Sequence, residues 1–288
     1  MITANNDNLK SAGFYWRTGE PGIIALSCTK LDESGFTNGF STRLGGTSQM
    51  PIEALNLAGF NDDTAHNIHE NRRRFLSLFK NNQVKHWKLG TVWQVHGADI
   101  MTIKDYELFE DKMLDKARCD GLVTNLSGVL IGVKAADCVP VLLADPRTKA
   151  IGVVHAGWRG TSMSIVTRAI ENMSKNYDSN PNDLIVAIGP AASVCCYEIG
   201  QEVIDVFIKN FDYSADLLAP TRASHALINL KEANRRQLID SGVQAGNICC
   251  APLCTICRND LFFSYRREKK LYGKVGRLLS VIGHSGHN

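Results

Sequence analysis

The stretch "AIGVVHAGWRG" (150–160) joins an apolar run to a histidine, an indole, an arginine and two glycines. Its first half is rich in β-branched residues, which is typical of a buried strand. The residues that follow, "GTSMSIVTRAI" (160–170), have helical spacing. Gly157 and Gly160 relax the exit from the strand. The stretch therefore predicts a strand, a turn and a helix, with His155 where the strand ends.

Similar apolar runs recur along the whole chain. Strands are predicted at 22–28, 37–42, 91–95, 99–103, 128–133, 139–145, 150–155, 184–189 and 278–283. Helices are predicted at 65–80, 160–175, 200–210 and 231–241. Their order is mixed and lacks strict alternation, which favours an α+β fold: a single layered domain of packed mixed β-sheets flanked by helices. No linker divides residues 1–288, and 1–20 are expected to form a peripheral N-terminal segment.

Composition excludes several classes of protein. The 288 residues are 44% apolar and 21% charged, which excludes disordered and fibrous proteins. A net charge of +3, with only short basic runs at 71–75 and 265–270, predicts no nucleic-acid partner. No run approaches the roughly 18 apolar residues of a membrane span, and the N-terminus lacks a signal-peptide core. We therefore expect a cytoplasmic protein whose nine cysteines stay reduced.

Three separate segments each place a metal-binding side chain at the edge of an apolar run. They are "QVHG" with His96, "ADCVPV" with Cys138 and "VVHAG" with His155, 42 and then 17 residues apart. Singly, such a histidine is usually a hydrogen-bonded structural residue and such a cysteine a small buried hydrophobe. Strand ends of a layered fold converge at one rim, however, and a His₂Cys set suits zinc while leaving a fourth position open.

An open zinc position is compatible with catalysis. Zinc would hold Cys138 as a thiolate and lower the pKa of a bound water from about 16 to about 7. Copper also accepts a His₂Cys set. The sequence therefore predicts His96, Cys138 and His155 as catalytic and metal-binding residues, with zinc as the cofactor and copper as the alternative.

The motifs as a group resemble the YfiH/laccase-domain family, whose members were first described as polyphenol oxidases and later as zinc-dependent purine nucleoside phosphorylases. The resemblance rests on "QVHG" (94–97), "ADCVPV" (136–141), "HAGWRG" (155–160), "CCYEIG" (195–200) and "LFFSYRR" (261–267). It covers nearly the whole chain, from about residue 38 to 283. It implies an α/β/β/α-like layered fold and the same three metal-binding residues.

Further residues are candidates for binding substrate or phosphate. Arg43 precedes a Gly-Gly turn, where a guanidinium can bind phosphate oxygens bidentately. Arg159 is expected near the first turn of a helix, where free N–H groups favour an anion. The resemblance adds pocket residues, so the full candidate set is Asn38, Arg43, Arg159, Tyr197, Ser264 and Arg267. Asp137, beside Cys138, is expected to have a structural role.

The segment "CCAPLCTIC" (249–257) contains a C-x-x-C pair, Cys254 and Cys257. Such a pair raises the question of a second zinc or a redox pair. Because no second half of a Cys₄ site occurs at a usual spacing, we interpret Cys257 as incidental. Cys195 and Cys196 are interpreted as packing residues.

The function that these observations and the resemblance favour is phosphorolysis of purine nucleosides: adenosine, inosine, guanosine or methylthioadenosine. Adenosine deamination at the same zinc site is included, because a zinc-activated water can attack C6 of adenine. The expected partners are nucleosides and phosphate, and the expected state is a monomer or weak dimer.

Three alternatives remain at this point. A copper-dependent polyphenol oxidase is the first, although the chain has eight histidines and no H-x-H pair. A metal-free hydrolase using Cys138 and His155 is the second. The third is a binding protein without catalytic activity, in which zinc only stabilises the fold.

Overall fold

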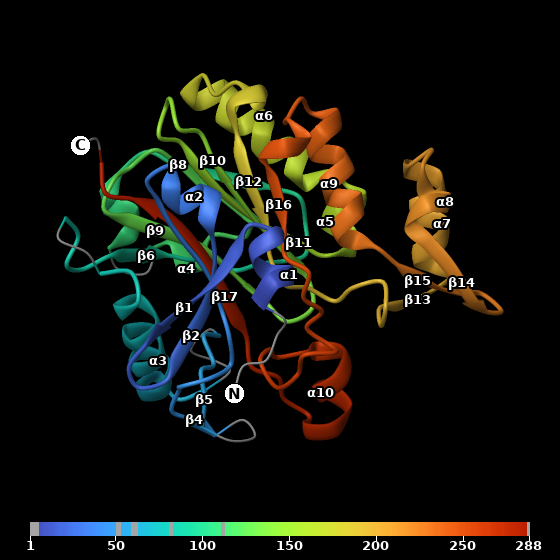
Figure 1. Cartoon of the computed structure of the whole chain (residues 1–288), viewed down its shortest axis with the longest axis horizontal. Helices are drawn as coiled ribbons and strands as arrows, with labels where there is room; N and C mark the ends of the chain where they lie inside the picture. Colours follow the sequence, from blue (N-terminus) through green and yellow to red (C-terminus); the bar gives the residue numbers. More distant parts are fainter. Residues whose placement is uncertain (1–5, 50–52, 59–62, 81–82, 111–112, 287–288) are drawn as a thin grey trace.

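Two six-stranded sheets stack face to face, with helices on their outer faces, in the computed structural model of the chain (Figure 1). The structure describes residues 6–49, 53–58, 63–80, 83–110 and 113–286. The layered α+β architecture expected from the sequence is thus confirmed.

The first sheet has the order β1-β2-β3-β17-β9-β6. Its strands are β1 (Phe14–Gly19), β2 (Ile23–Cys28), β3 (Phe36–Ser41), β17 (Leu278–His284), β9 (Val129–Ala135) and β6 (Lys88–Gly90). Neighbours are antiparallel except β6 and β9. The sheet thus joins the two ends of the chain, since β17 lies between β3 and β9.

The second sheet has the order β16-β12-β10-β11-β8-β7 and contains the strand of the "AIGVVHAGWRG" segment. Its strands are β16 (Ile248–Cys250), β12 (Ile185–Ile188), β10 (Val139–Ala144), β11 (Ile151–Ala156), β8 (Gly121–Thr124) and β7 (Ile100–Ile103). β10 and β11 form an antiparallel pair in which Pro140 is opposite His155. This pairing brings the beginning of β10 to the end of β11.

The central strands are apolar on both faces because each face has its own core. In β11, Ile151 and Val153 point into the space between the sheets, while Val154 belongs to the core under the outer helices. Successive side chains of a strand point to opposite faces, so a strand covered on both sides must be apolar throughout. This is why the strands at 139–144 and 151–156 read as continuous apolar runs.

Helices cover both outer faces. α3 (Ala65–Ser77) packs Phe75 against the first sheet, and the Thr64 hydroxyl caps its N-terminus by accepting from the Asn67 N–H. α6 (Ile165–Tyr177) and α9 (Leu230–Asp240) cover the second sheet. Shorter helical segments of the layered body are α1 (Asn6–Ser11), α2 (Thr29–Glu33), α4 (Met113–Lys116), α5 (Trp158–Ser162), α10 (Tyr265–Tyr272), η1 (Tyr106–Phe109), η2 (Pro181–Asp183) and η3 (Ala245–Asn247). In addition, β4 (Ser48–Gln49) pairs with β5 (Glu53–Ala54).

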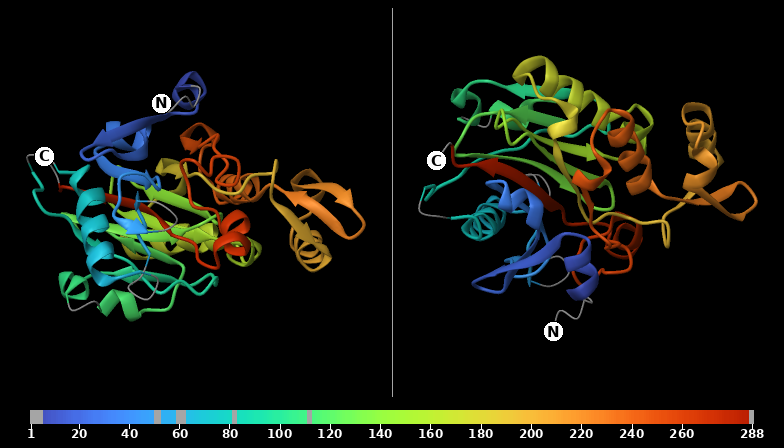
Figure 2. Two further views of the ribbon diagram at one scale, coloured as in Figure 1. Left: turned by 90° about the horizontal axis from the view of Figure 1, so that it is seen from below. Right: turned by 45° about the horizontal axis from the view of Figure 1, so that its top comes forward.

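A smaller lobe projects from one side of the layered body (Figure 2). It consists of a three-stranded sheet, β13 (Glu198–Gly200), β15 (His225–Ile228) and β14 (Leu218–Arg222), with α7 (Gln201–Asn210) and α8 (Ser214–Leu217). The chain enters this lobe directly after Tyr197. The lobe is therefore attached beside the segment that the sequence analysis linked to the pocket.

Three local expectations are wrong. Residues 91–95 form no strand and make only one bridge, from Trp93 to Arg118, because the Val95 N–H bonds to the Asp120 carboxylate and not to a neighbouring strand. The single helix expected at 160–175 is two, α5 and α6, separated where Ser164 adopts a left-handed φ of 58°. The segment 1–20 is not wholly peripheral, since β1 joins the sheet and Phe14 is fully buried.

Within the described ranges, no helix combines the length and apolar character needed to cross a membrane.

Candidate functional site

His96, Cys138 and His155 converge, as the sequence analysis predicted. One potential ligand atom from each residue lies within 4.8 Å of the others. The imidazole rings of His96 and His155 meet edge to face, with centroids 5.0 Å apart. His155 is buried, Cys138 is half-buried and His96 is exposed. The group is consequently anchored in the sheet on one side and open to solvent on the other.

The pairing of β10 with β11 explains why Cys138 meets His155. Cys138 directly precedes β10, and Val139 is opposite Ala156 in the register. This places Cys138 beside Gly157, where a Cβ would lie 3.2 Å from the Cys138 sulfur and 3.4 Å from His96 Cδ2. A side chain at position 157 would therefore crowd both ligands, and glycine leaves the space that they occupy.

Asp120, which the sequence analysis did not single out, positions both histidines. Its Oδ1 lies 2.8 Å from His155 Nδ1, and its backbone carbonyl accepts from the His155 N–H at 2.7 Å. Its carboxylate also accepts from the backbone N–H groups of Val95, His96 and Gly97. One buried carboxylate thus fixes the His155 ring and folds the loop that carries His96. With Nδ1 held by Asp120, Nε2 is the nitrogen of His155 that is left to bind a metal.

The backbone is strained at two positions of the site. His96 has a φ of 58° and Asp137 a φ of 85°, in the left-handed region that non-glycine residues rarely adopt. Such conformations persist only where surrounding contacts impose them, and they gather at functional sites. At His96 the contacts come from Asp120. At Asp137 the carboxylate accepts from Thr255, Ser264 and the Arg266 N–H. Asp137 is thus structural, as expected.

The electrostatics of the site favour an ionised sulfur. Burial opposes ionisation of Cys138, but His155 and His96 lower its pKa to about 6. Burial would likewise lower the pKa of His155, but the Cys138 and Asp120 charges raise it to about 9. At pH 7 the metal-free pair is a thiolate and an imidazolium. A thiolate is the form of cysteine that binds metals and attacks electrophiles.

The donor set fits a zinc ion. Zinc binds thiolate sulfur at about 2.3 Å and imidazole nitrogen at about 2.0–2.1 Å. Three donor atoms within 4.8 Å of one another can surround a single ion at these lengths. Asp120 behind His155 supplies the carboxylate–histidine arrangement that usually supports such a ligand. The residues therefore fit a metal with three protein ligands.

Tyr197 lies close enough to Cys138 to sense its charge. Burial raises its pKa to about 12, and the charges of Cys138 and Asp137 act in the same direction. Its phenol therefore stays protonated at neutral pH and can donate a hydrogen bond. The Arg266 guanidinium lies over the Tyr197 ring, 5.1 Å from its centre. Arg266, which the sequence analysis passed over for Arg267, is thus the arginine of "YRR" that contacts Tyr197.

The structure does not bring the other candidates to the three ligands in the same way. Arg43 pairs with Glu268 at 2.8 Å and lies over the ring of Phe263. A phosphate at Arg43 would have to displace a buried carboxylate. Asn38 is fully buried and its amide bonds to Cys28 and Asp32, inside the first sheet.

The last three candidates differ in exposure. Ser264 is buried, donates to Asp137 and caps α10 by accepting from the Arg267 N–H. Arg267 donates to the Ile256 carbonyl at 3.3 Å. Arg159 is exposed and stacks over Trp158, 4.2 Å from the ring centre. It follows His155 by four residues, so it remains the exposed cation on the α5 side of the site.

Comparison with known proteins places this geometry in a family. Residues 37–285 match the model of the family described as "Multi-copper polyphenol oxidoreductase laccase". The chain belongs to this family. The resemblance to the YfiH/laccase-domain family that the motifs indicated is confirmed.

The chain is similar to named relatives over most of its own length and of theirs. The purine nucleoside phosphorylase YlmD of Geobacillus stearothermophilus is 34% identical over 90% of this chain and 93% of its own. The purine nucleoside phosphorylase YfiH of Escherichia coli is 30% identical over 84% of this chain and 91% of its own. The crystal structure of YlmD from Geobacillus stearothermophilus superposes with a TM-score of 0.82 at 32% identity, covering 93% of this chain and 98% of that one.

Proposed function

We propose that the chain is a zinc-dependent purine nucleoside phosphorylase whose site consists of His96, Cys138 and His155. The observation that carries the proposal is the convergence of these three side chains with one side open to solvent. The names of the relatives supply the reaction: phosphate attacks C1′ of the sugar, the bond from C1′ to N9 breaks, and the base leaves as the sugar 1-phosphate forms.

The chain's own residues have separate roles in this reaction. Asp120 orients His155, and Gly157 leaves room for the ligands. The protonated phenol of Tyr197 offers a hydrogen-bond donor to the departing base. Arg159 and Arg266 are the cations that we assign to attracting phosphate. A bound zinc ion supplies Lewis acidity at the fourth, open position.

Adenosine deamination at the same site is part of the proposal: water replaces the 6-amino group of the base and ammonia leaves as inosine forms, and a bound zinc ion would contribute Lewis acidity to this reaction. Zinc is proposed over copper because a multicopper centre needs many more histidines than surround this site. Within the described residues, the groups arranged to hold a metal are this His₂Cys set and one all-cysteine set.

The proposal is tested by incubating the purified protein with inosine and adenosine, with and without phosphate. We expect hypoxanthine and sugar 1-phosphate from inosine only when phosphate is present, and inosine as an additional product from adenosine. Cys138→Ala should lower release by a factor on the order of 10³, whereas Cys250→Ser, outside both groups, should not. Unchanged release in Cys138→Ala would refute the proposal, and release that survives complete chelation would favour the metal-free Cys138–His155 hydrolase.

A further inference from the structure

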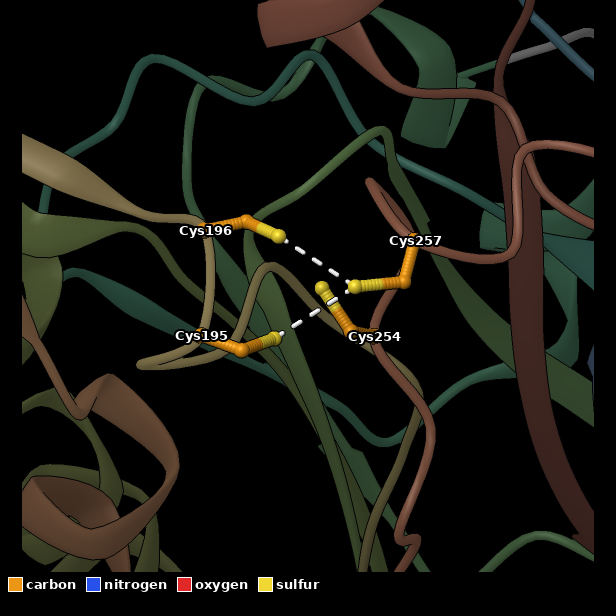
Figure 3. A group of neighbouring side chains, drawn as sticks. All are labelled: Cys195, Cys196, Cys254 and Cys257. Atoms are coloured by element: carbon orange, nitrogen blue, oxygen red, sulfur yellow. Dashed lines mark hydrogen bonds between the residues drawn. The ribbon is translucent and has the colours of Figure 1, made fainter.

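Four further cysteines meet in space (Figure 3). Cys195 and Cys196 lie in the turn before β13, and Cys254 and Cys257 follow β16. All four sulfurs lie within 4.8 Å of one another. The Cys257 sulfur is 3.5 Å from that of Cys195 and 3.2 Å from that of Cys196.

The interpretation of Cys195 as a packing residue was wrong, because its side chain is exposed. Cys257, which was interpreted as incidental, lies next to the sulfurs of Cys195 and Cys196. The second half of a Cys₄ site does exist, but it lies about sixty residues upstream of the C-x-x-C pair. The fold joins the two halves because β12 and β16 run parallel and Ala191 then forms a bridge with Cys254.

We propose that Cys195, Cys196, Cys254 and Cys257 bind a zinc ion in a closed structural site. Nothing in the family's description or in the names of the relatives assigns these residues. The inference goes beyond the proposed phosphorylase activity and does not depend on it. A closed site follows from the ligand count, because four sulfurs fill all four positions of tetrahedral zinc and leave none for substrate.

The sulfur positions match a single ion. Zinc–sulfur bonds of about 2.3 Å in a tetrahedron place neighbouring sulfurs about 3.8 Å apart. The observed separations of 3.2 and 3.5 Å, and the limit of 4.8 Å for the whole group, lie around this value. Small side-chain rotations are enough to form the site.

The backbone around the cluster is built to support thiolates. The N–H groups of Ser193, Ile256 and Cys257 hydrogen bond to the sulfur of Cys254. The Thr255 N–H donates to the Ala191 carbonyl at 3.1 Å, and the Cys196 N–H donates to the Ser193 carbonyl at 2.9 Å. Both turns are therefore fixed by main-chain bonds, and a metal would find its ligands already in position.

Cations nearby offset the negative charge of four thiolates around one divalent ion. Buried Lys231 donates to the carbonyls of Ala251 and Leu253, close to the cluster. Burial lowers the pKa of Lys231, and the sulfurs of Cys250, Cys254 and Cys195 oppose that shift. Arg267 donates to the carbonyl of Ile256, between the two cysteines of the C-x-x-C pair. Both contacts favour a negatively charged metal complex.

A zinc ion here would connect the two segments that flank the open site. One segment continues into Tyr197 and the projecting lobe, and the other contains Thr255, whose hydroxyl donates to Asp137 at 2.6 Å. Asp137 in turn directly precedes Cys138. The closed site would therefore hold the pocket side and the lobe in place without touching substrate.

The proposal is tested on the full-length protein, produced with zinc and purified in the presence of a thiol reductant, by measuring metal content. We expect about two zinc ions per chain in the parent protein and about one in Cys257→Ser and in Cys195→Ser. Cys138→Ala should also hold about one, and the control Cys250→Ser about two. X-ray absorption at the zinc edge should show only sulfur neighbours, at about 2.3 Å, in Cys138→Ala.

Each outcome decides the proposal. Full zinc content in both folded serine variants would overturn it, as would nitrogen or oxygen neighbours in the Cys138→Ala spectrum, iron in place of zinc, or a disulfide within the cluster of the freshly reduced protein. The zinc kept by His96, Cys138 and His155 reports that the serine variants are folded. Loss of zinc in Cys257→Ser but not in Cys138→Ala would uphold this site and refute the zinc of the proposed phosphorylase.

Discussion

The two groups of side chains that we propose as metal sites differ in their electrostatics and in their exposure. At His96, Cys138 and His155 the protein lowers the pKa of the sulfur to about 6, orients one imidazole through a buried carboxylate and keeps a side open. At the four-cysteine cluster, burial raises the pKa of Cys195 to about 11 and also raises that of Cys196, and further cysteines add to both shifts.

The difference reflects the number of protein ligands. A closed site gains four metal bonds, which can offset the free energy of ionising thiols whose pKa is raised. An open site has only three, so its geometry must be held by the fold itself. Changes in the supporting residues are therefore expected to matter more at the open site than at the closed one.

The largest expected effect is that of removing the sulfur of the open site. Cys138→Ala should lower phosphate-dependent base release by a factor on the order of 10³, because the metal loses its anionic ligand. Steady-state kinetics with inosine measure this. If Cys257→Ser caused the same loss while Cys138→Ala did not, the roles of the two groups would be reversed.

A smaller effect is expected at the supporting carboxylate. Asp120→Asn should weaken zinc binding at the open site or activity by about 10–100-fold, the range typical for a partner behind a ligating histidine. Competition with a chromogenic chelator gives the affinity. Asp216→Asn, at an exposed ion pair on the projecting lobe, is the control. Equal affinity in the two variants would show that Asp120 does not position His155.

A methyl group at position 157, close to the Cys138 sulfur, should have a moderate effect on zinc affinity at the open site. Gly157→Ala places a methyl group 3.2 Å from the Cys138 sulfur, so zinc affinity at the open site should fall about tenfold. Gly246→Ala is the matched control, since a Cβ there meets nothing within 4 Å. Unchanged affinity in Gly157→Ala would mean that the hairpin relaxes without disturbing the ligands.

The smallest expected effect is a difference between the two groups in the number of protons released when zinc binds. At pH 7 Cys138 lies above its pKa and His155 below its own, so zinc binding to Cys257→Ser should release about one proton, from His155. In Cys138→Ala, zinc binding at the cysteine cluster should release at least about two, because Cys195 and Cys196 are protonated. Calorimetry in buffers of different ionisation enthalpy counts these protons. Equal numbers of released protons would show that the two sites do not differ in the protonation of their ligands.

Sequence reasoning located the open site through local patterns. Cys138 and His155 lie at the ends of two strands that pair, so their apolar runs already indicated a common edge. His96 was found from its motif, although the strand expected before it does not exist. The layered fold followed from the mixed order of strands and helices.

What sequence reasoning missed depends on contacts between distant segments. Asp120 lies 35 residues before His155, and nothing in "RCDGLV" distinguishes it from an ordinary carboxylate at a strand start. The cysteine cluster needs the parallel pairing of β12 with β16. The pairing of Arg43 with Glu268 spans 225 residues and forms only when α10 docks. Such contacts become visible only after the topology is known.

The central claim is that His96, Cys138 and His155 surround a metal ion with a vacant fourth position. A crystal structure with anomalous diffraction recorded at the zinc edge tests it most directly. We predict a peak bounded by these three side chains and one non-protein ligand, separate from a second peak bounded by four sulfurs. The absence of a peak at the three side chains, or a fourth protein ligand closing that site, would contradict the account.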